Sequence, residues 1–169
     1  MTQDEIRSLF AFNAWANHRT LEACAALTPA QFTAPAPSSF PTVHDTLRHI
    51  MGVEWLYLER LQGRHPTSLL PGETFADVAA MVERWKGIKK GLEDYIRSPD
   101  LGDLERIIEY HNLQGKPFRY PLRVLLQHVV NHGTYHRGQV VTQLREIGVK
   151  PLSTDLLRYY DALAGLPVD

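Results

Sequence analysis

The segment Leu125–Val141, LLQHVVNHGTYHRGQVV, constrains the fold most, because it combines a helical repeat of apolar residues with regularly spaced histidines. His128, His132 and His136 follow one another at intervals of four residues. In a helix, each imidazole then lies about 40° around the axis from the one before. No proline interrupts the run. The segment is therefore predicted to be a buried or half-buried helix with three histidines on one face.

Other stretches of the chain show the same helical spacing of apolar side chains. They are Asp4–Leu27, Thr42–Leu61 and Thr74–Ile96, the last with a stop at Ser98–Pro99. Thr42 is the predicted N-cap of the second stretch, with Asp45 in the place of a capping-box acid. The intervening segment Pro29–Pro41 is rich in proline, which at this density cannot continue a helix, and it is predicted to be an ordered or semi-rigid loop.

The segment 106–120, RIIEYHNLQGKPFRY, has a different pattern, with β-branched and aromatic residues on both sides of a polar turn at Asn112–Lys116. This pattern predicts a short hairpin. The histidine helix then begins at Leu122 and ends at Gly148, and a final short helix spans Thr154–Ala164. The expected fold is all-α: an antiparallel four-helix bundle in a single domain, 1–169, with a short extra C-terminal helix and a small hairpin.

The charge balance argues against several classes of function. The chain has 18 Lys and Arg against 19 Asp and Glu, and no block of like charges, so it lacks the basic patch of a nucleic-acid or anionic-membrane binder. No run approaches the roughly 20 apolar residues of a spanning helix, and the N-terminus lacks the apolar core of a secretory signal. We therefore expect a cytoplasmic protein without nucleic-acid or membrane partners. The lone cysteine, Cys24, lies on an apolar helical stripe and is expected to serve packing.

The histidines suggest metal chemistry. Neutral imidazole is a good ligand for Zn, Ni, Fe or Cu, and two histidines one helical turn apart can reach a single ion. Several histidines in an apolar helix are costly unless their nitrogens are satisfied, and His49 in the second helix has a similarly apolar context. A three-histidine site with an open fourth position follows. The alternative is a buried hydrogen-bond network among His128, His132, His136, Asn131 and Gln139.

The run Asn131–Gln139, NHGTYHRGQ, resembles the DinB family of bacterial proteins, as do LRHIMGVEWLYLERL around His49 and the opening Phe10–Ala23, FAFNAWANHRTLEA. The resemblance covers nearly the whole chain in the same order. It implies a four-helix bundle, commonly a homodimer, that holds a divalent metal through three histidines. These match His49, His132 and His136. The resemblance places His128 beside the ligands or in the core.

Neighbouring residues of the same helix receive weaker predictions. Gln139 lies three residues after His136 and could contact a metal-bound water or a substrate. Tyr135 is a second candidate for substrate contact. Arg137 points about 100° away from His136, so a structural pairing with a carboxylate or a helix end is expected. Gly138 is predicted to permit the close approach of a neighbouring helix.

The resemblance points to a metal-dependent hydrolase, or to a transferase that uses a low-molecular-weight thiol, acting on a small-molecule substrate. Zn or Ni is the expected ion. A metal held by three histidines with an open position would lower the pKa of a bound water or thiol and so make a nucleophile at neutral pH. The general base is not assigned, because no Glu stands in an HExxH-like position and nothing in the sequence aims Glu54 at the site. The alternative is a non-catalytic metal-binding stress-response protein in which the ion stabilises the bundle.

Overall fold

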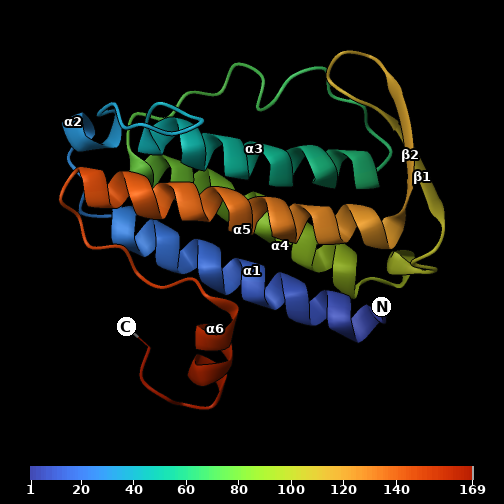
Figure 1. Ribbon diagram of the computed structural model, residues 1–169. Helices are drawn as coiled ribbons and strands as arrows, with labels where there is room; N and C mark the ends of the chain where they lie inside the picture. The colour runs from blue at the N-terminus through green and yellow to red at the C-terminus, as the bar shows by residue number, and fades with distance from the viewer. Residues whose placement is uncertain (169) are drawn as a thin grey trace.

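The computed structural model describes residues 1–168, and within them four long helices form a bundle (Figure 1). These helices are α1 (Gln3–Cys24), α3 (Val43–Leu61), α4 (Val78–Arg97) and α5 (Leu122–Glu146). Both α4 and α5 pack against α1 and α3. The α3/α5 seam and the α1/α4 seam therefore lie on opposite sides of the bundle. The predicted all-α bundle is confirmed.

The helix directions follow from the long connection over residues 62–77, which returns along the bundle (Figure 1). As a result α3 and α4 run in the same direction, with Trp85 beside Glu54 and Gly91 beside Leu58. The α3/α5 and α1/α4 seams are antiparallel. Each of these two seams therefore brings together residues that lie far apart in the sequence.

Side-chain caps fix the ends of the long helices. Thr42 caps α3 as predicted, because its hydroxyl accepts from the backbone N–H of Asp45 at 3.0 Å. The start predicted for α4 at Thr74 is wrong: the helix begins at Val78, and the carboxylate of Asp77 accepts from the N–H of Ala80 at 2.8 Å. An aspartate cap satisfies the free N–H groups of the first turn there.

Short helical pieces occur where the sequence predicted only a loop or a stop. The helix α2 (Pro29–Phe32) begins after Thr28, which forms a capping box with Gln31. Proline is compatible with the first helical turn, where no N–H is needed. The four-residue helix buries Phe32 against the bundle. A 3-10 turn, η1 (Pro99–Leu101), follows α4.

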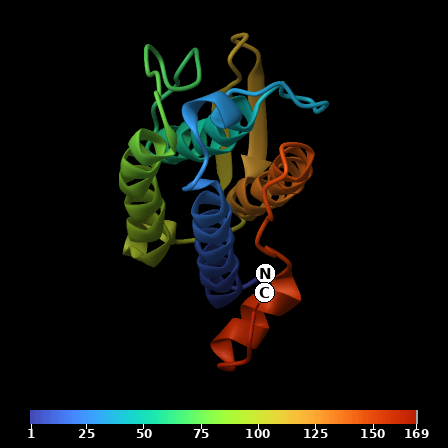
Figure 2. The ribbon, with the colours of Figure 1, turned by 90° about the vertical axis from the view of Figure 1, so that its left-hand side faces the viewer.

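The predicted hairpin is present at one end of the bundle (Figure 1). Strands β1 (Ile107–His111) and β2 (Pro117–Pro121) pair antiparallel, and Gly115 in the turn has a φ of 76°. No linker separates β2 from α5, since the helix begins at Leu122. The C-terminal helix α6 (Leu156–Leu163) packs against α1 at the edge of the bundle (Figure 2).

The core lies between the four long helices and contains Cys24, which is fully buried. Burial raises the pKa of this thiol to about 12, so it is a poor nucleophile at neutral pH, as expected for a packing residue. Within residues 1–168, every helix is too short or too polar to cross a lipid bilayer.

Candidate metal centre

Three histidines converge on the α3/α5 seam. His49 comes from α3, and His132 and His136 come from successive turns of α5. One ring nitrogen of each lies within 4.8 Å of the other two. The Nε2 atoms of His49 and His132 are 2.9 Å apart, although 83 positions separate the residues in the chain. The fold thus brings together the three residues that the family resemblance singled out.

The spacing of these nitrogens fits a single metal ion. In tetrahedral coordination, metal–nitrogen bonds of about 2.0–2.1 Å place ligand nitrogens about 3.3 Å apart. The 2.9 Å pair is slightly closer than this and the 4.8 Å limit is wider, so the three nitrogens lie near the spacing of a single tetrahedral site. A donor set of imidazoles suits Zn, Ni or Cu rather than Mg or Ca.

The protonation state of the rings also suits metal binding. Burial lowers the pKa of His132 to about 3, and the neighbouring His136 and His49 add to the effect. Burial, and then His136, lowers the pKa of His49 to about 4. Both rings are therefore neutral at pH 7, and neutral imidazole is the form that binds a metal.

Gln139 sets the orientation of the third ring. Its Oε1 lies 2.7 Å from Nδ1 of His136, and an amide oxygen can only accept, so Nδ1 carries the proton. The lone pair of His136 is then on Nε2, the nitrogen available to an ion. The amide Nε2 of Gln139 in turn donates to Oγ of Ser39 at 2.9 Å. A contact between Gln139 and a substrate stays a prediction.

The loop before α3 forms one wall of the cluster. The ring of Phe40 lies 4.4 Å from the ring of His49 and 5.6 Å from that of His136, measured between centroids. Gln143 holds this loop by donating to the backbone carbonyl of Phe40 at 2.9 Å, and it accepts from the hydroxyl of Thr46 at 2.9 Å. Neither Phe40 nor Gln143 was predicted from the sequence to lie at the site. The signal for Gln143 was its position seven residues after His136, which places it on the same helix face.

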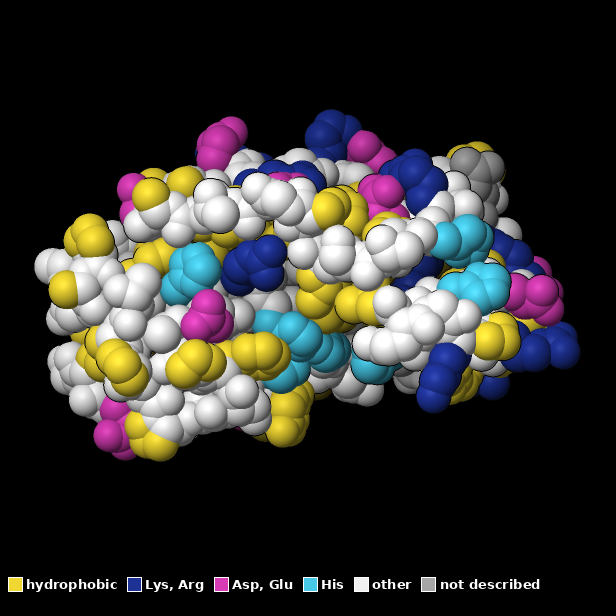
Figure 3. All heavy atoms as spheres, turned by 90° about the horizontal axis from the view of Figure 1, so that it is seen from above, with side chains coloured by type: hydrophobic (Ala, Val, Ile, Leu, Met, Phe, Trp, Pro, Cys, Tyr) yellow, Lys and Arg dark blue, Asp and Glu magenta, His cyan; other side chains and the backbone are white. Residues whose placement is uncertain are grey.

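The remaining candidates lie around the rim. Tyr135 is 66% exposed, with its ring centroid 4.9 Å from that of His136. His128 lies one turn before His132, with ring centroids 5.8 Å apart, and its ring is tilted against that of Tyr57 at a centroid distance of 5.2 Å. Figure 3 shows histidine side chains reaching the surface near the middle of this face, beside hydrophobic ones.

A buried polar network lies on the other side of α5. Arg137 is 1% exposed, and its Nη1 donates to Oδ1 of Asn13 and to Oδ1 of Asn17, each at 2.7 Å. The same two side chains donate through Nδ2 to Oε1 of Glu54, at 2.6 and 2.7 Å. Trp85 donates to the other oxygen of Glu54 at 2.5 Å. The network thus joins all four long helices.

Two asparagine amides therefore stand between the charges of Arg137 and Glu54. The expected partner of Arg137 was a carboxylate or a helix end. In the structure, Arg137 reaches the carboxylate of Glu54 only indirectly, through the side-chain amide of Asn13. Burial lowers the pKa of Arg137 to about 10, and Glu54 opposes this shift. The guanidinium thus keeps its charge at neutral pH.

A glycine makes room for this network, but not the one expected. A Cβ on Gly133 would lie 2.7 Å from Nη1 of Arg137 and 2.8 Å from Oδ1 of Asn13. Gly138 instead faces open space, with nothing within 4 Å of a Cβ. The close approach predicted at Gly138 is therefore wrong. The close contact occurs at Gly133, five residues earlier on the same helix.

An all-α bundle with three converging histidines on one seam defines the class: a helical-bundle protein with a candidate metal centre. The sequence model of the DinB family matches residues 1–164, and the chain belongs to this family. Protein DinB of Bacillus subtilis is 26% identical over 168 residues, covering 87% of this chain and 88% of that protein. The crystal structure of a DinB-like protein from Bacillus cereus superposes with a TM-score of 0.60 at 17% identity. It covers 83% of this chain and 91% of that one, and it supports the fold.

Proposed function

We propose that the protein binds a divalent metal ion, Zn or Ni, through His49, His132 and His136 and acts as a metal-dependent hydrolase or thiol transferase. The observation that carries this proposal is the convergence of three imidazole nitrogens within 4.8 Å on one seam. The lowered pKa values of His49 and His132 support it, because both rings are ready to coordinate at neutral pH.

The surrounding residues support a site that is open on one side. When bound, an ion supplies Lewis acidity and lowers the pKa of a water or thiol that reaches it. Gln139 holds the tautomer of His136, and the ring of Phe40 shields His49 from water on the loop side. The exposed side chain of Tyr135 lies at the rim, where a small-molecule substrate would pass.

A non-catalytic role for the ion is the second candidate. It is favoured by the position of Glu54, a residue that is 3% exposed. Its carboxylate accepts from Asn13, Asn17 and Trp85, so it cannot serve as a base at the histidines. In this alternative, the ion would cross-link α3 and α5 and stabilise the bundle.

We also propose a homodimer, as the family resemblance implies. The edge helix α6 supports this proposal, since Leu157 and Leu163 are 72% and 65% exposed. Light scattering on the purified protein measures the molar mass directly, and a monomer across the accessible concentration range would contradict it.

Metal analysis of protein purified without a histidine tag or nickel column tests the site. We expect wild-type protein and the His128→Ala control to retain a bound ion, and His49→Ala and His132→Ala to lose it. Retention of the metal by both His49→Ala and His132→Ala would overturn the site.

Activity and stability measurements then separate the two roles. Zn- or Ni-loaded protein is assayed on esters, amides and thiol–electrophile pairs, and its melting temperature is compared with and without chelator. Turnover that His132→Ala abolishes supports the enzyme. No turnover on the whole panel, together with a large loss of stability on chelation, supports the structural role.

A further inference from the structure

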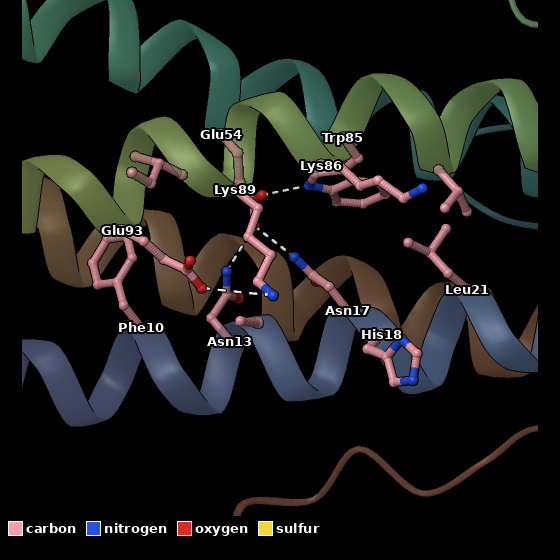
Figure 4. Close-up of a pocket in the computed structure, with 13 residues that line it drawn as sticks. Phe10, Asn13, Asn17, His18, Leu21, Glu54, Trp85, Lys86, Lys89 and Glu93 are labelled. Atoms are coloured by element: carbon pink, nitrogen blue, oxygen red, sulfur yellow. Dashed lines mark hydrogen bonds and ion pairs between the residues drawn. The ribbon is translucent and has the colours of Figure 1, made fainter.

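A cavity of about 270 Å³ opens between α1 and α4, on the seam diagonally opposite the histidines (Figure 4). Its walls are mostly apolar and come from both helices. They include Phe10, Ala14, Leu21, Val82, Trp85 and Leu92. The helices α1 and α4 thus leave room for a molecule other than their own side chains.

The floor of this cavity is the buried network. Asn13, Asn17, Glu54 and Trp85 all line the cavity, and their side chains point toward one another in Figure 4. A carboxylate can accept about four hydrogen bonds. Glu54 receives three, from Asn13, Asn17 and Trp85. By this count, one acceptor position of the Glu54 carboxylate is unused, on a side chain that lines the cavity.

Flexible charged side chains stand at the mouth. Lys89 reaches across the opening toward Glu93, with Nζ 3.6 Å from Oε1 (Figure 4). Both side chains are solvent-exposed, at 54% and 36%, so their pairing contributes little free energy. Lys89 can therefore move aside without breaking a buried contact.

We propose that this cavity binds a small neutral molecule with an apolar body of one or two rings and a hydroxyl that donates to Glu54. The volume supports the size, because a dry cavity of about 150 Å³ holds benzene. The carboxylate can only accept, so the ligand must donate. Arg137 already balances the charge of Glu54 through Asn13 and Asn17, which favours a neutral hydroxyl over an ammonium group.

Titration with phenol and with toluene tests the proposal on the intact protein. The readout is the set of NMR signals from the Trp85 indole and the Asn13 and Asn17 side-chain amides, recorded with chelator present so that a metal plays no part. We expect saturable shifts with phenol and binding about tenfold weaker with toluene, which has no donor. Benzylammonium is expected to bind more weakly than phenol.

Two cavity-filling variants locate the binding. Ala14→Phe fills the cavity from α1 and is expected to abolish the phenol shifts, whereas Ala11→Phe, exposed on the same helix and outside the cavity, is the matched control. Val82→Phe fills the cavity from α4 and replaces Ala14→Phe if that variant does not fold. Equal binding of toluene and phenol, no saturable shift up to the solubility limit of phenol, or full phenol binding by a folded filled variant would overturn the proposal.

Discussion

His136 and Arg137 are consecutive residues of α5 whose side chains contact different neighbouring helices. The ring of His136 lies 4.6 Å from that of His49 on the α3/α5 seam, while Arg137 donates to Asn13 and Asn17 of α1. The buried network therefore fixes the rotation of α5 about its own axis. That rotation decides whether the α5 histidines face His49.

Replacing Arg137 with alanine should strongly destabilise the fold. The change leaves the buried carboxylate of Glu54 without its countercharge, which typically costs about 3–5 kcal/mol. Urea unfolding measures the loss. Arg145→Ala, on the exposed face of the same helix, is the control and should change the free energy of unfolding by less than about 0.5 kcal/mol. Equal effects of the two changes would contradict the role of the network.

Two glycines of α5 should respond oppositely to alanine. Gly133→Ala places a methyl group 2.7 Å from Nη1 of Arg137, so we expect a loss of about 1–3 kcal/mol. Gly138→Ala meets open space on a helix and should stabilise by about 0.5–1 kcal/mol. Thermal unfolding of both variants checks the pair, and a neutral Gly133→Ala would show that Arg137 and Asn13 can move apart freely.

Removing the amide of Gln139 should weaken metal binding without removing a ligand. The bond from Gln139 to Nδ1 of His136 fixes the tautomer, and losing such a partner typically costs about 10–100-fold in affinity. Competition with a chromogenic chelator measures the affinity of Gln139→Ala. The control is Gln127→Ala, three turns earlier on α5, which should match the wild type.

The metal-free protein should lose stability as the pH falls from about 6.5 toward 4. The unfolded histidines titrate near 6.5, whereas the folded pKa values are about 4 for His49 and about 3 for His132. In this window the unfolded state binds more protons, so acid favours unfolding, by on the order of 2 kcal/mol for the coupled pair. Urea unfolding at several pH values with chelator present measures the slope, which His132→Asn should reduce. A free energy of unfolding that does not change between pH 6.5 and 4 in the wild type would contradict this prediction.

The sequence predicted the long helices and the hairpin because both depend on local periodicity and turn chemistry. It could not place the start of α4, since Thr74 and Asp77 are competing caps and only the packing of Val78 against the bundle decides between them. His49 stood out through its apolar surroundings and the family resemblance. Spacing alone favoured His128, rather than His49, as the third histidine of the site. His128 lies outside the cluster.

Contacts between residues far apart in the chain could not be predicted from the sequence. In the sequence, Asn13 and Asn17 are ordinary polar residues in an apolar helix. Only the structure shows that they contact Arg137 and Glu54. Phe40 lies in a proline-rich loop, where no periodicity shows which way a side chain points. These positions depend on how the helices pack together, which local patterns do not encode.

The 124 positions between Asn13 and Arg137 have a consequence for synthesis of the chain. Helices α1, α3 and α4 leave the ribosome before α5, so Glu54 has no countercharge and His49 no partner until the last long helix is made. We therefore expect a nascent chain of three helices to close poorly around an unpaired carboxylate. We expect the bundle and the histidine cluster to form together once α5 is complete.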